Sequence, residues 1–534
     1  MNKSLFPRLP GMLTRTSKWL LLLFCFMLGT TSYAQHPVGI FEDNLDIGNP
    51  KLAGSASYDA STQVYTLAGA GDNIWFNKDE FHFLYKKIQG DFLLTADFEF
   101  TGDTSGAIGH RKIGWMIRES TEADAASANA CKHIDGLVVL QWRPYKGMFM
   151  RDPEEERFYP KQGGQTIQLE RIGKTITMKI AHPGEPLQLV GSYETDVLDK
   201  KEVLVGLYIC SHDSNTLAHA RVWNVRIDHP VMHPYTSNPH AVIPPVKEVF
   251  GCRLEILDVL DGHRKVIYEA PDRFEAPNWM PDGKKLLMNK GGLLYTISTE
   301  GGTPEKLNTG SVSKINNDHV ISFNGKMLGI SSSREGLPGG GSTVYVLPLS
   351  GGEPRLITDN TPSYLHGWNP NGKEIAIVAK RNGSDVYNLF KVSLSDRKET
   401  ALTNNTKGHV DGPEYSPDGK YIYYNANASG TMQIWRMKTD GSDQQQLTFD
   451  DYNNWFPHLS PDGKWLVMIS FPYDIDPAAH PAYKEVMLRL MPLTEGGAPR
   501  VLAYLYGGQG TINVPSWSPD SKHLAFVSNS EPVK

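Results

Sequence analysis

Histidine side chains gather beside a recurring turn in the C-terminal half of this 534-residue chain. A neutral imidazole is the commonest protein ligand for transition metals, and three or four converging ligands are enough to hold one ion. An ion with open coordination positions polarises a substrate oxygen or activates a water molecule. We expect one divalent metal (Mn, Zn or Ca) to be bound by His319, His366, His458, His480 and Gln509.

Three further residues on the same side of these turns are candidates for acid–base or charge-stabilising work. His409 and Asp411 directly precede one copy of the turn, and Arg334 lies in the Gly-rich stretch SREGLPGGGS. We therefore expect Asp411, His409 and Arg334 to be catalytic. A metal-free site, with histidine as general acid or base, is the alternative chemistry. Any one of these histidines could instead be an ordinary surface group or a satisfied hydrogen-bond partner.

The turn occurs in six copies, and the candidate residues lie at positions defined relative to it. Its copies occupy 276–284, 318–326, 365–373, 412–420, 456–464 and 514–522, with spacings from 42 to 58 residues. Pro fixes φ, Asp caps the turn with its side chain, and Gly supplies a positive φ. Alternating strands such as YIYYNA and QIWRMKT follow each turn. This period and pattern predict a β-propeller with one blade per copy.

Departures from the repeat are the informative positions, because the repeat is turn chemistry. Four residues before the Pro position of the turn, four copies have Pro and two adjacent copies have His319 and His366. In a propeller this position lies where the chain enters the innermost strand, around the central channel. The sixth copy has a single strand after its turn, and residues 253–268 read as two strands around Asp261. We expect these strands to complete the last blade, which gives six blades over 249–531 and leaves no open sheet edge.

Residues 36–230 lack the repeat and consist of short β-type runs separated by turn residues. This pattern predicts a β-sandwich. LERIGKTITMKI reads as a hairpin that turns at Gly173, and alternating apolar neighbours favour core positions for Trp115 and Trp223. The Pro-rich residues 231–248 read as an extended linker. The expected fold is therefore all-β, with a sandwich followed by a propeller.

Both halves resemble known families. PNWMPDGKKLLM, PEYSPDGKYIYYN and PSWSPDSKHLAFVS resemble the WD-like repeats of TolB-type propellers. That family includes protein-binding propellers of the envelope, and metal-dependent lyases use related propellers, so the resemblance fixes fold and leaves function open. GWMIR, QLERIGKTITM and ARVWNVRI resemble the concanavalin A-like jelly rolls found beside carbohydrate-active domains. That resemblance implies a sugar-binding sheet face, with Trp75, Trp142 and Arg143 as its carbohydrate-binding residues.

The first 34 residues have the features of a signal peptide. Four basic residues precede the short apolar run WLLLLFCFMLG, and Ser32-Tyr33-Ala34 fits a cleavage site. The run is shorter than the roughly 20 residues of a membrane helix, so we expect a periplasmic or secreted protein without a membrane span. Because the segment has no acidic residue, its removal changes the formal net charge from −6 to about −10. That charge argues against a nucleic-acid partner. Cys131 and Cys210 could form a disulfide, but three buried free thiols are the favoured state.

Two functions remain open at this point. The first is an exported glycan-binding and glycan-processing protein, with the propeller mouth as a metal-assisted lyase or hydrolase site and a polysaccharide or oligosaccharide as its partner. The second is a non-catalytic scaffold of the cell envelope that binds a protein partner through the propeller face.

Overall fold

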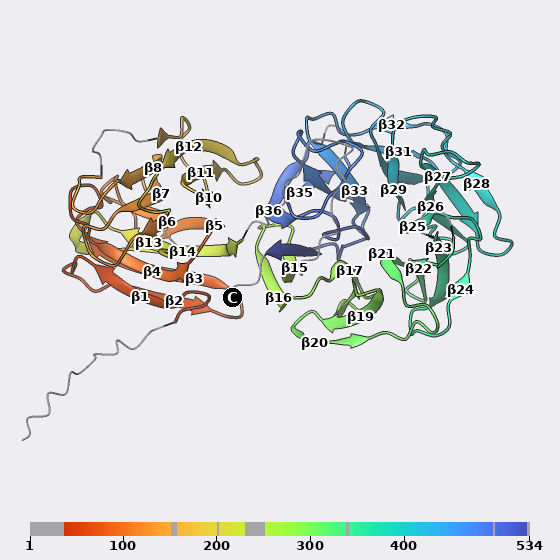
Figure 1. The fold of residues 1–534 in the computed structure, drawn as a ribbon, viewed down its shortest axis with the longest axis horizontal. Coiled ribbons are helices and arrows are strands. Elements are labelled where there is room, and N and C mark those ends of the chain that lie inside the picture. The colour runs from red at the N-terminus through yellow and green to blue at the C-terminus, as the bar shows by residue number, and fades with distance from the viewer. Residues whose placement is uncertain are drawn as a thin grey trace, which may run out of the picture.

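Two all-β units form the protein in a computed structural model, which describes residues 37–150, 157–199, 202–229, 251–337, 341–494 and 497–530. The expected signal peptide (1–34) and linker (231–248) lie outside the described residues. Figure 1 shows the N-terminal unit as a sandwich and the C-terminal unit as a ring of blades. Within the described ranges, no helix has the length and hydropathy of a membrane span.

The N-terminal unit consists of two seven-stranded sheets, and all their pairings are antiparallel. The β6 sheet has the order β1 (Asp43–Ile47), β4 (Phe81–Ile88), β13 (Val203–Cys210), β6 (Lys112–Arg118), β7 (Ser127–His133), β8 (Val138–Arg143) and β9 (Arg157–Phe158). The β5 sheet has the order β12 (Gln188–Glu194), β11 (Thr175–Ala181), β10 (Thr166–Ile172), β5 (Phe92–Thr101), β14 (Asp213–Asp228), β3 (Val64–Gly71) and β2 (Ser55–Asp59). The predicted hairpin is confirmed, since Ile172 pairs with Thr175 across Gly173.

A continuous apolar core lies between these sheets, as period-two alternation requires. Trp115 is fully buried in it, and its indole nitrogen donates to the carbonyl of Ile167 on the facing sheet at 3.2 Å. Trp223 is 8% exposed, so the core positions expected for both tryptophans are confirmed. Cys131, Cys210 and Cys252 are buried and are thiols, not members of a disulfide.

The C-terminal unit is a six-bladed propeller, as predicted. Five blades have four strands each, from the channel outward: β17 (Glu275–Trp279), β18 (Lys285–Lys290), β19 (Leu293–Ser298), β20 (Gly301–Lys306); β21 (Ile315–Ile321), β22 (Met327–Ser333), β23 (Ser342–Pro348), β24 (Arg355–Leu356); β25 (Ser363–Trp368), β26 (Glu374–Ala379), β27 (Asn388–Ser393), β28 (Glu399–Ala401); β29 (Val410–Tyr415), β30 (Tyr421–Ala426), β31 (Gln433–Lys438), β32 (Gln445–Gln446); and β33 (Asn453–Leu459), β34 (Trp465–Phe471), β35 (Lys484–Pro492), β36 (Arg500–Gly507).

The sixth blade closes the ring with strands from both ends of the unit. β15 (Gly251–Asp258) pairs with β37 (His523–Ser530) on one side and with β16 (Arg264–Ala270) on the other. Trp517 bridges to Leu524 at the channel side. The closure predicted from residues 253–268 is therefore confirmed, and it removes the free edge of the last blade.

The repeated turn has the structural role that its composition predicts. In the fourth copy, Asp418 accepts hydrogen bonds from the Ser416 hydroxyl at 2.7 Å and from the backbone nitrogen of Lys420 at 3.1 Å. Gly419 has a φ of 70°. The Asp and Gly of the repeat therefore stabilise hairpins.

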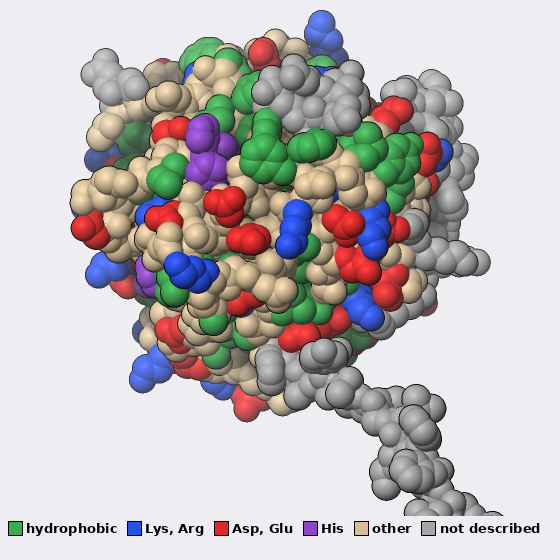
Figure 2. Space-filling view, turned by 90° about the vertical axis from the view of Figure 1, so that its left-hand side faces the viewer, with side chains coloured by type: hydrophobic (Ala, Val, Ile, Leu, Met, Phe, Trp, Pro, Cys, Tyr) green, Lys and Arg blue, Asp and Glu red, His purple; other side chains and the backbone are tan. Residues whose placement is uncertain are grey.

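Buried ion pairs join the two units. Arg226 of β14 donates to Glu255 of β15 at 2.6 Å, and Arg264 of β16 donates to the same carboxylate at 2.8 Å. Glu255 is fully buried, and the two guanidinium charges outweigh its burial and hold its pKa below the usual value. A second bridge links Arg253 to Asp228. Figure 2 shows the face of the molecule at the sandwich end, where acidic and basic side chains are interspersed.

Candidate functional site at the channel mouth

A polar cavity of about 310 Å³ opens where the innermost strands of four consecutive blades begin. Each of these strands contributes from its first half, before the repeated turn. The lining residues are Asn316, Asn317, Asp318, Tyr364, His366, Val378, Tyr387, His409, Asp411, Phe456, His480, Gln509 and Asn513. We call this the mouth cavity. Its residues come from the same end of β21, β25, β29 and β33 and from the loops beside them.

A β-bulge in each innermost strand aims these side chains. In β25 the register shifts between Leu365 and Gly367, so His366 is the extra residue and leaves the ladder. In β29 the shift follows Asp411, and Gly412 takes a φ of 59°. Bulges re-aim side chains at the rims of sheets, so Asp411 and His366 reach the channel because the regular pairing is interrupted there.

Asp411 is the centre of the mouth cavity and lies close to three imidazoles. Its carboxylate oxygens lie 3.1 Å from His366 Nε2, 3.5 Å from His409 Nε2 and 4.0 Å from His480 Nε2. The side chain of Asp411 is 13% exposed, so the group meets solvent only through the cavity. His480 is held in place by the Trp455 ring, with 4.4 Å between ring centroids.

Burial and neighbouring charges shift the pKa values of the two carboxylates in the cavity, Asp318 and Asp411, in opposite directions. Burial raises the pKa of Asp318 to about 6. Burial would also raise the pKa of Asp411, but the hydrogen bonds and charges of His366 and His409 outweigh it and hold that pKa well below its usual value. Environments that push two carboxyl pKa values apart are typical of acid–base sites.

The imidazoles differ in the same way. Burial lowers the pKa of His366, but the charges of Asp318 and Asp411 outweigh it and the net shift is upward. Burial lowers the pKa of His480. The surroundings therefore favour the charged form of His366, which pairs with Asp411, and the neutral form of His480. These are complementary states for moving a proton.

One buried nitrogen in the cavity, His480 Nδ1, lacks a hydrogen-bond partner among the described residues. Buried polar atoms are normally satisfied, so this nitrogen indicates the place of a ligand. Together with Asp411 and His409 it suits the hydroxyl groups of a substrate.

Five sequence-predicted residues line the cavity, and three do not. His366, His409, Asp411, His480 and Gln509 are brought together. His458 lies below the mouth cavity, with Nδ1 2.6 Å from Glu414 and Nε2 2.5 Å from the Ile512 carbonyl, so both of its nitrogens are already bound. Arg334 is exposed on its loop and does not line the cavity.

His319 is also outside the cavity, although its repeat position matches that of His366. The bulge of β21 is longer, with three residues between the paired Ile315 and His319 opposite one residue of β22. His319 therefore falls back into the ladder opposite Ile330, where it is fully buried. Asp318 takes the place at the channel. The sequence signal for Asp318 was the polar run Asn316–Asp318, whereas nothing in the repeat pointed to Tyr364 or Tyr387.

The expected sugar-binding residues of the sandwich are also only partly at a surface. Trp142 is 4% exposed in the inter-sheet core, stacked on Tyr193. Arg143 is fully buried and donates to both oxygens of Asp79 at 2.5 and 2.7 Å. Contrary to the expectation, neither presents a face to a sugar, because both serve the fold. Trp75 is half-buried, with the Lys112 ammonium 5.6 Å from its ring.

Known proteins match the C-terminal half. The family model described as the TolB beta-propeller domain matches residues 365–474. An uncharacterised protein of Agrobacterium fabrum is 44% identical over 275 residues, which cover 51% of this chain and 91% of that protein. A solved structure of a candidate TolB from Agrobacterium tumefaciens is 42% identical, with a TM-score of 0.50, and the match covers 53% of this chain and 99% of that one.

A more distant match is the Tol-Pal system protein TolB of Anaeromyxobacter dehalogenans, at 26% identity over 137 residues. The match spans only 31% of that protein. The high coverage of the Agrobacterium relatives, the matched domain model and the six blades agree with one another. Through its C-terminal half, the chain belongs to the TolB-like β-propeller family.

Proposed function

We propose that this protein is an exported, periplasmic enzyme that processes glycans by acid–base catalysis in the mouth cavity. The proposal is carried by one observation: the buried Asp411 carboxylate lies within 4.0 Å of the imidazoles of His366, His409 and His480, in a cavity that Asp318 also lines. A cavity of about 310 Å³ suits a small polar ligand such as one end of an oligosaccharide.

The chemistry follows from the protonation states. Protonated Asp318 donates a proton to the leaving glycosidic oxygen. An imidazole of the mouth cavity, His480 or His409, accepts the proton from the attacking water molecule in a hydrolase, or from the carbon beside a uronate carboxylate in a lyase. The His366–Asp411 pair orients these groups. The expected divalent metal has no part in this proposal, because no three ligand atoms of the mouth cavity lie within 4.8 Å of one another among the described residues.

The sandwich would bind the polymer in this proposal. Its two antiparallel sheets support a concanavalin A-like assignment. Exposed aromatic rings near Trp75, namely Phe76 and Phe149 at 6.3 Å between centroids, offer faces on which sugar rings stack. The sandwich would then hold polysaccharide while the propeller acts on it.

The test is a screen of uronate-containing and neutral polysaccharides with the purified protein, with and without a chelator. Unsaturated products that absorb in the ultraviolet identify a lyase, and new reducing ends without that absorbance identify a hydrolase. Asp318→Asn and His409→Ala are expected to lower the rate by roughly 10²–10⁴-fold, the usual contribution of a general acid or base. Arg334→Ala is the matched control, since Arg334 is outside the mouth cavity. Equal rates in all variants would reject the site.

The similarity to a candidate TolB favours a second function, a non-catalytic propeller that binds an envelope protein. In that case no glycan is turned over, and Asp318→Asn leaves partner capture from envelope extracts unchanged. Glycan turnover by the wild type that is lost in Asp318→Asn would favour the enzyme over the non-catalytic propeller.

A further inference from the structure

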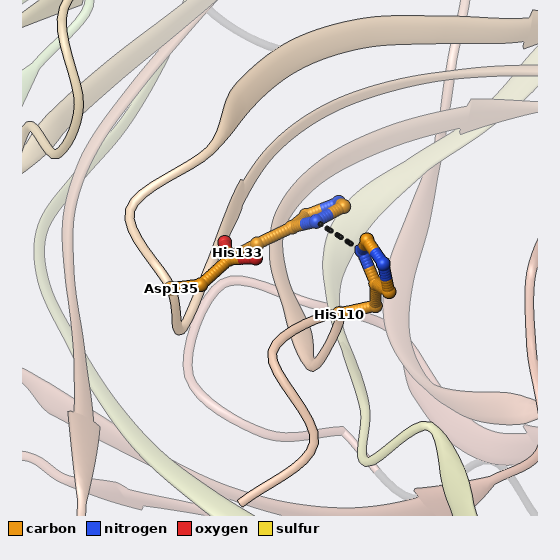
Figure 3. Close-up of side chains that lie close together, drawn as sticks. All are labelled: His110, His133 and Asp135. Atoms are coloured by element: carbon orange, nitrogen blue, oxygen red, sulfur yellow. Dashed lines mark hydrogen bonds between the residues drawn. The ribbon is translucent and has the colours of Figure 1, made fainter.

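A second cluster of imidazoles belongs to the sandwich and lies at one end of the β6 sheet. Among the described residues, one group of three or more His, Cys, Asp or Glu side chains has all its ligand atoms within 4.8 Å of one another: His110, His133 and Asp135. Figure 3 shows the His110 and His133 rings close together and almost perpendicular, with the Asp135 carboxylate on the side of His133. The mouth cavity contains no group that meets this spacing.

Strand topology explains the convergence. β13, β6 and β7 are neighbours and antiparallel, so β6 begins at the end of the sheet where β13 and β7 finish. His110 is two residues before Lys112, and His133 pairs with Lys112. His212 is two residues after Cys210, which also pairs with Lys112. Three histidines therefore leave three adjacent strand ends, and the His110 and His212 ring centroids are 5.5 Å apart.

Backbone contacts hold this arrangement in place. The Ile134 nitrogen donates to the Arg111 carbonyl at 3.1 Å, and the Asp135 nitrogen donates to the Gly109 carbonyl at 3.3 Å. Asp135 Oδ1 accepts the Leu137 nitrogen at 3.0 Å, which orients the carboxylate. A Cβ at Gly109 would lie 2.9 Å from Asp135 Oδ2, so glycine permits the carboxylate to approach the His110 segment.

The spacing of the two rings matches that of ligands on one metal ion. His110 Nδ1 and His133 Nδ1 are 3.4 Å apart. Two imidazole nitrogens on a tetrahedral zinc ion, each about 2.05 Å from the metal, lie about 3.3 Å from each other.

His133 is 3% exposed, and its Nδ1 faces His110 Nδ1. Their separation of 3.4 Å is long for a hydrogen bond, and an ion bound by both nitrogens would replace that weak contact.

We propose that His110, His133 and Asp135 bind one zinc ion, with His212 next to the open coordination position. The Lys112 ammonium donates to Asn73 Oδ1 at 3.4 Å and lies 5.6 Å from the centroid of the Trp75 ring. His110 and Asp135 are exposed, so an ion can enter from solvent. The ion ties the segment before β6 to the hairpin between β7 and β8. This site is independent of the proposed glycan chemistry, because its residues belong to a different unit.

The test uses the full chain purified without a polyhistidine tag, stripped with a chelator and reloaded with Zn²⁺. Mass spectrometry of the metal content is expected to give about one zinc per chain, and reloading is expected to raise the melting temperature of the sandwich. Replacement by Co²⁺ gives the visible absorption bands of a tetrahedral nitrogen–oxygen site.

The variants use exposed side chains so that folding is preserved. His110→Ala and Asp135→Asn are each expected to weaken zinc binding by at least tenfold and to abolish the cobalt bands. His219→Ala, at an exposed position of β14, is the matched control and keeps both. His409→Ala in the propeller also keeps them. Zinc binding that survives His110→Ala unchanged, or wild-type protein that takes up no zinc, overturns the proposal.

Discussion

At the scale of single residues, the mouth cavity depends on how each carboxylate is solvated, and Asp318 makes this measurable. Its folded pKa is raised to about 6 from 3.8. The folded state therefore binds the Asp318 proton more tightly than the unfolded state does. This contribution to stability is complete below pH 3.8 and is lost as pH rises through 6.

Asp318→Asn keeps the shape and removes the charge. We expect its melting temperature to match that of the wild type near pH 4 and to exceed it at pH 8, by a free energy on the order of 2 kcal/mol. Thermal unfolding at the two pH values, in the presence of a chelator, measures this. An equal shift at both pH values would indicate a packing effect and would contradict the charge explanation.

A second residue-scale prediction concerns the buried ion cluster that includes Arg143. Asp79 binds Arg118 at 2.6 Å and Arg143 at 2.5 Å, and all three side chains are fully buried. Asp79→Ala leaves two unpaired buried guanidinium groups, and we expect it to destabilise the sandwich by about 3–5 kcal/mol. Denaturant unfolding followed by tryptophan fluorescence measures the loss. Glu122→Ala, which breaks an exposed pair with Lys146, is the control and should cost less than about 1 kcal/mol.

Residue type alone predicted membership of the cavity for some histidines and failed for others. His366 and His458 are both histidines in innermost strands. His458 is bound by Glu414 of the neighbouring blade, a partner 44 residues away in the chain. A local pattern does not contain such a partner, so the sequence could place these side chains near the channel but could not say which nitrogens stay free.

At the scale of elements, the bulges decide which side chain reaches the channel. Periodicity predicted the strands and the repeated turn well, because both are local. The bulge length is not visible in the repeat, so alignment placed His319 beside His366 and missed Asp318. The longer bulge of β21 places Asp318 at the channel and returns His319 to the strand ladder.

Gly412 tests the bulge of β29 directly. It has a φ of 59°, and a Cβ there would lie 2.9 Å from Asn425 Oδ1, the acceptor for the Phe456 nitrogen of the next blade. Gly412→Ala therefore disturbs two bulges at once. We expect it to cost roughly 1–2 kcal/mol for the left-handed backbone, plus a further loss from the displaced Asn425.

Gly173→Ala provides the comparison for Gly412→Ala. Gly173 has a similar φ of 53° but open space around it, so its variant measures the backbone cost alone. Chemical denaturation of both variants gives the difference, and glycan turnover should fall only in Gly412→Ala, because Asp411 precedes that glycine. Equal costs would mean that the bulge tolerates the methyl group.

At the scale of the whole molecule, the sequence predicted two β units and the closure of the ring, because repeat period and missing strands are global properties of the pattern. It did not predict that the units are joined by buried charges. The sequence of the expected linker, residues 231–248, has no pattern that predicts a contact between the two units. The pairing of Arg226 with Glu255 depends on how the surfaces of the two folded units meet.

Glu255 makes this junction testable. It is fully buried and accepts from Arg226 and Arg264, with the Ser528 hydroxyl at 2.5 Å on its other oxygen. Glu255→Ala leaves two buried guanidinium charges unpaired, and we expect a loss of about 3–5 kcal/mol. Because Arg226 belongs to the sandwich, calorimetry should show the two units melting separately in the variant and together in the wild type.

Lys179→Ala breaks the half-exposed pair with Glu485 at 3.1 Å and is the matched control across the same junction, with an expected cost below about 1 kcal/mol. If Glu255→Ala leaves a single transition of unchanged temperature, the junction does not couple the units. If it separates them, turnover of long polysaccharide should fall while turnover of short oligosaccharides, which need only the mouth cavity, is kept.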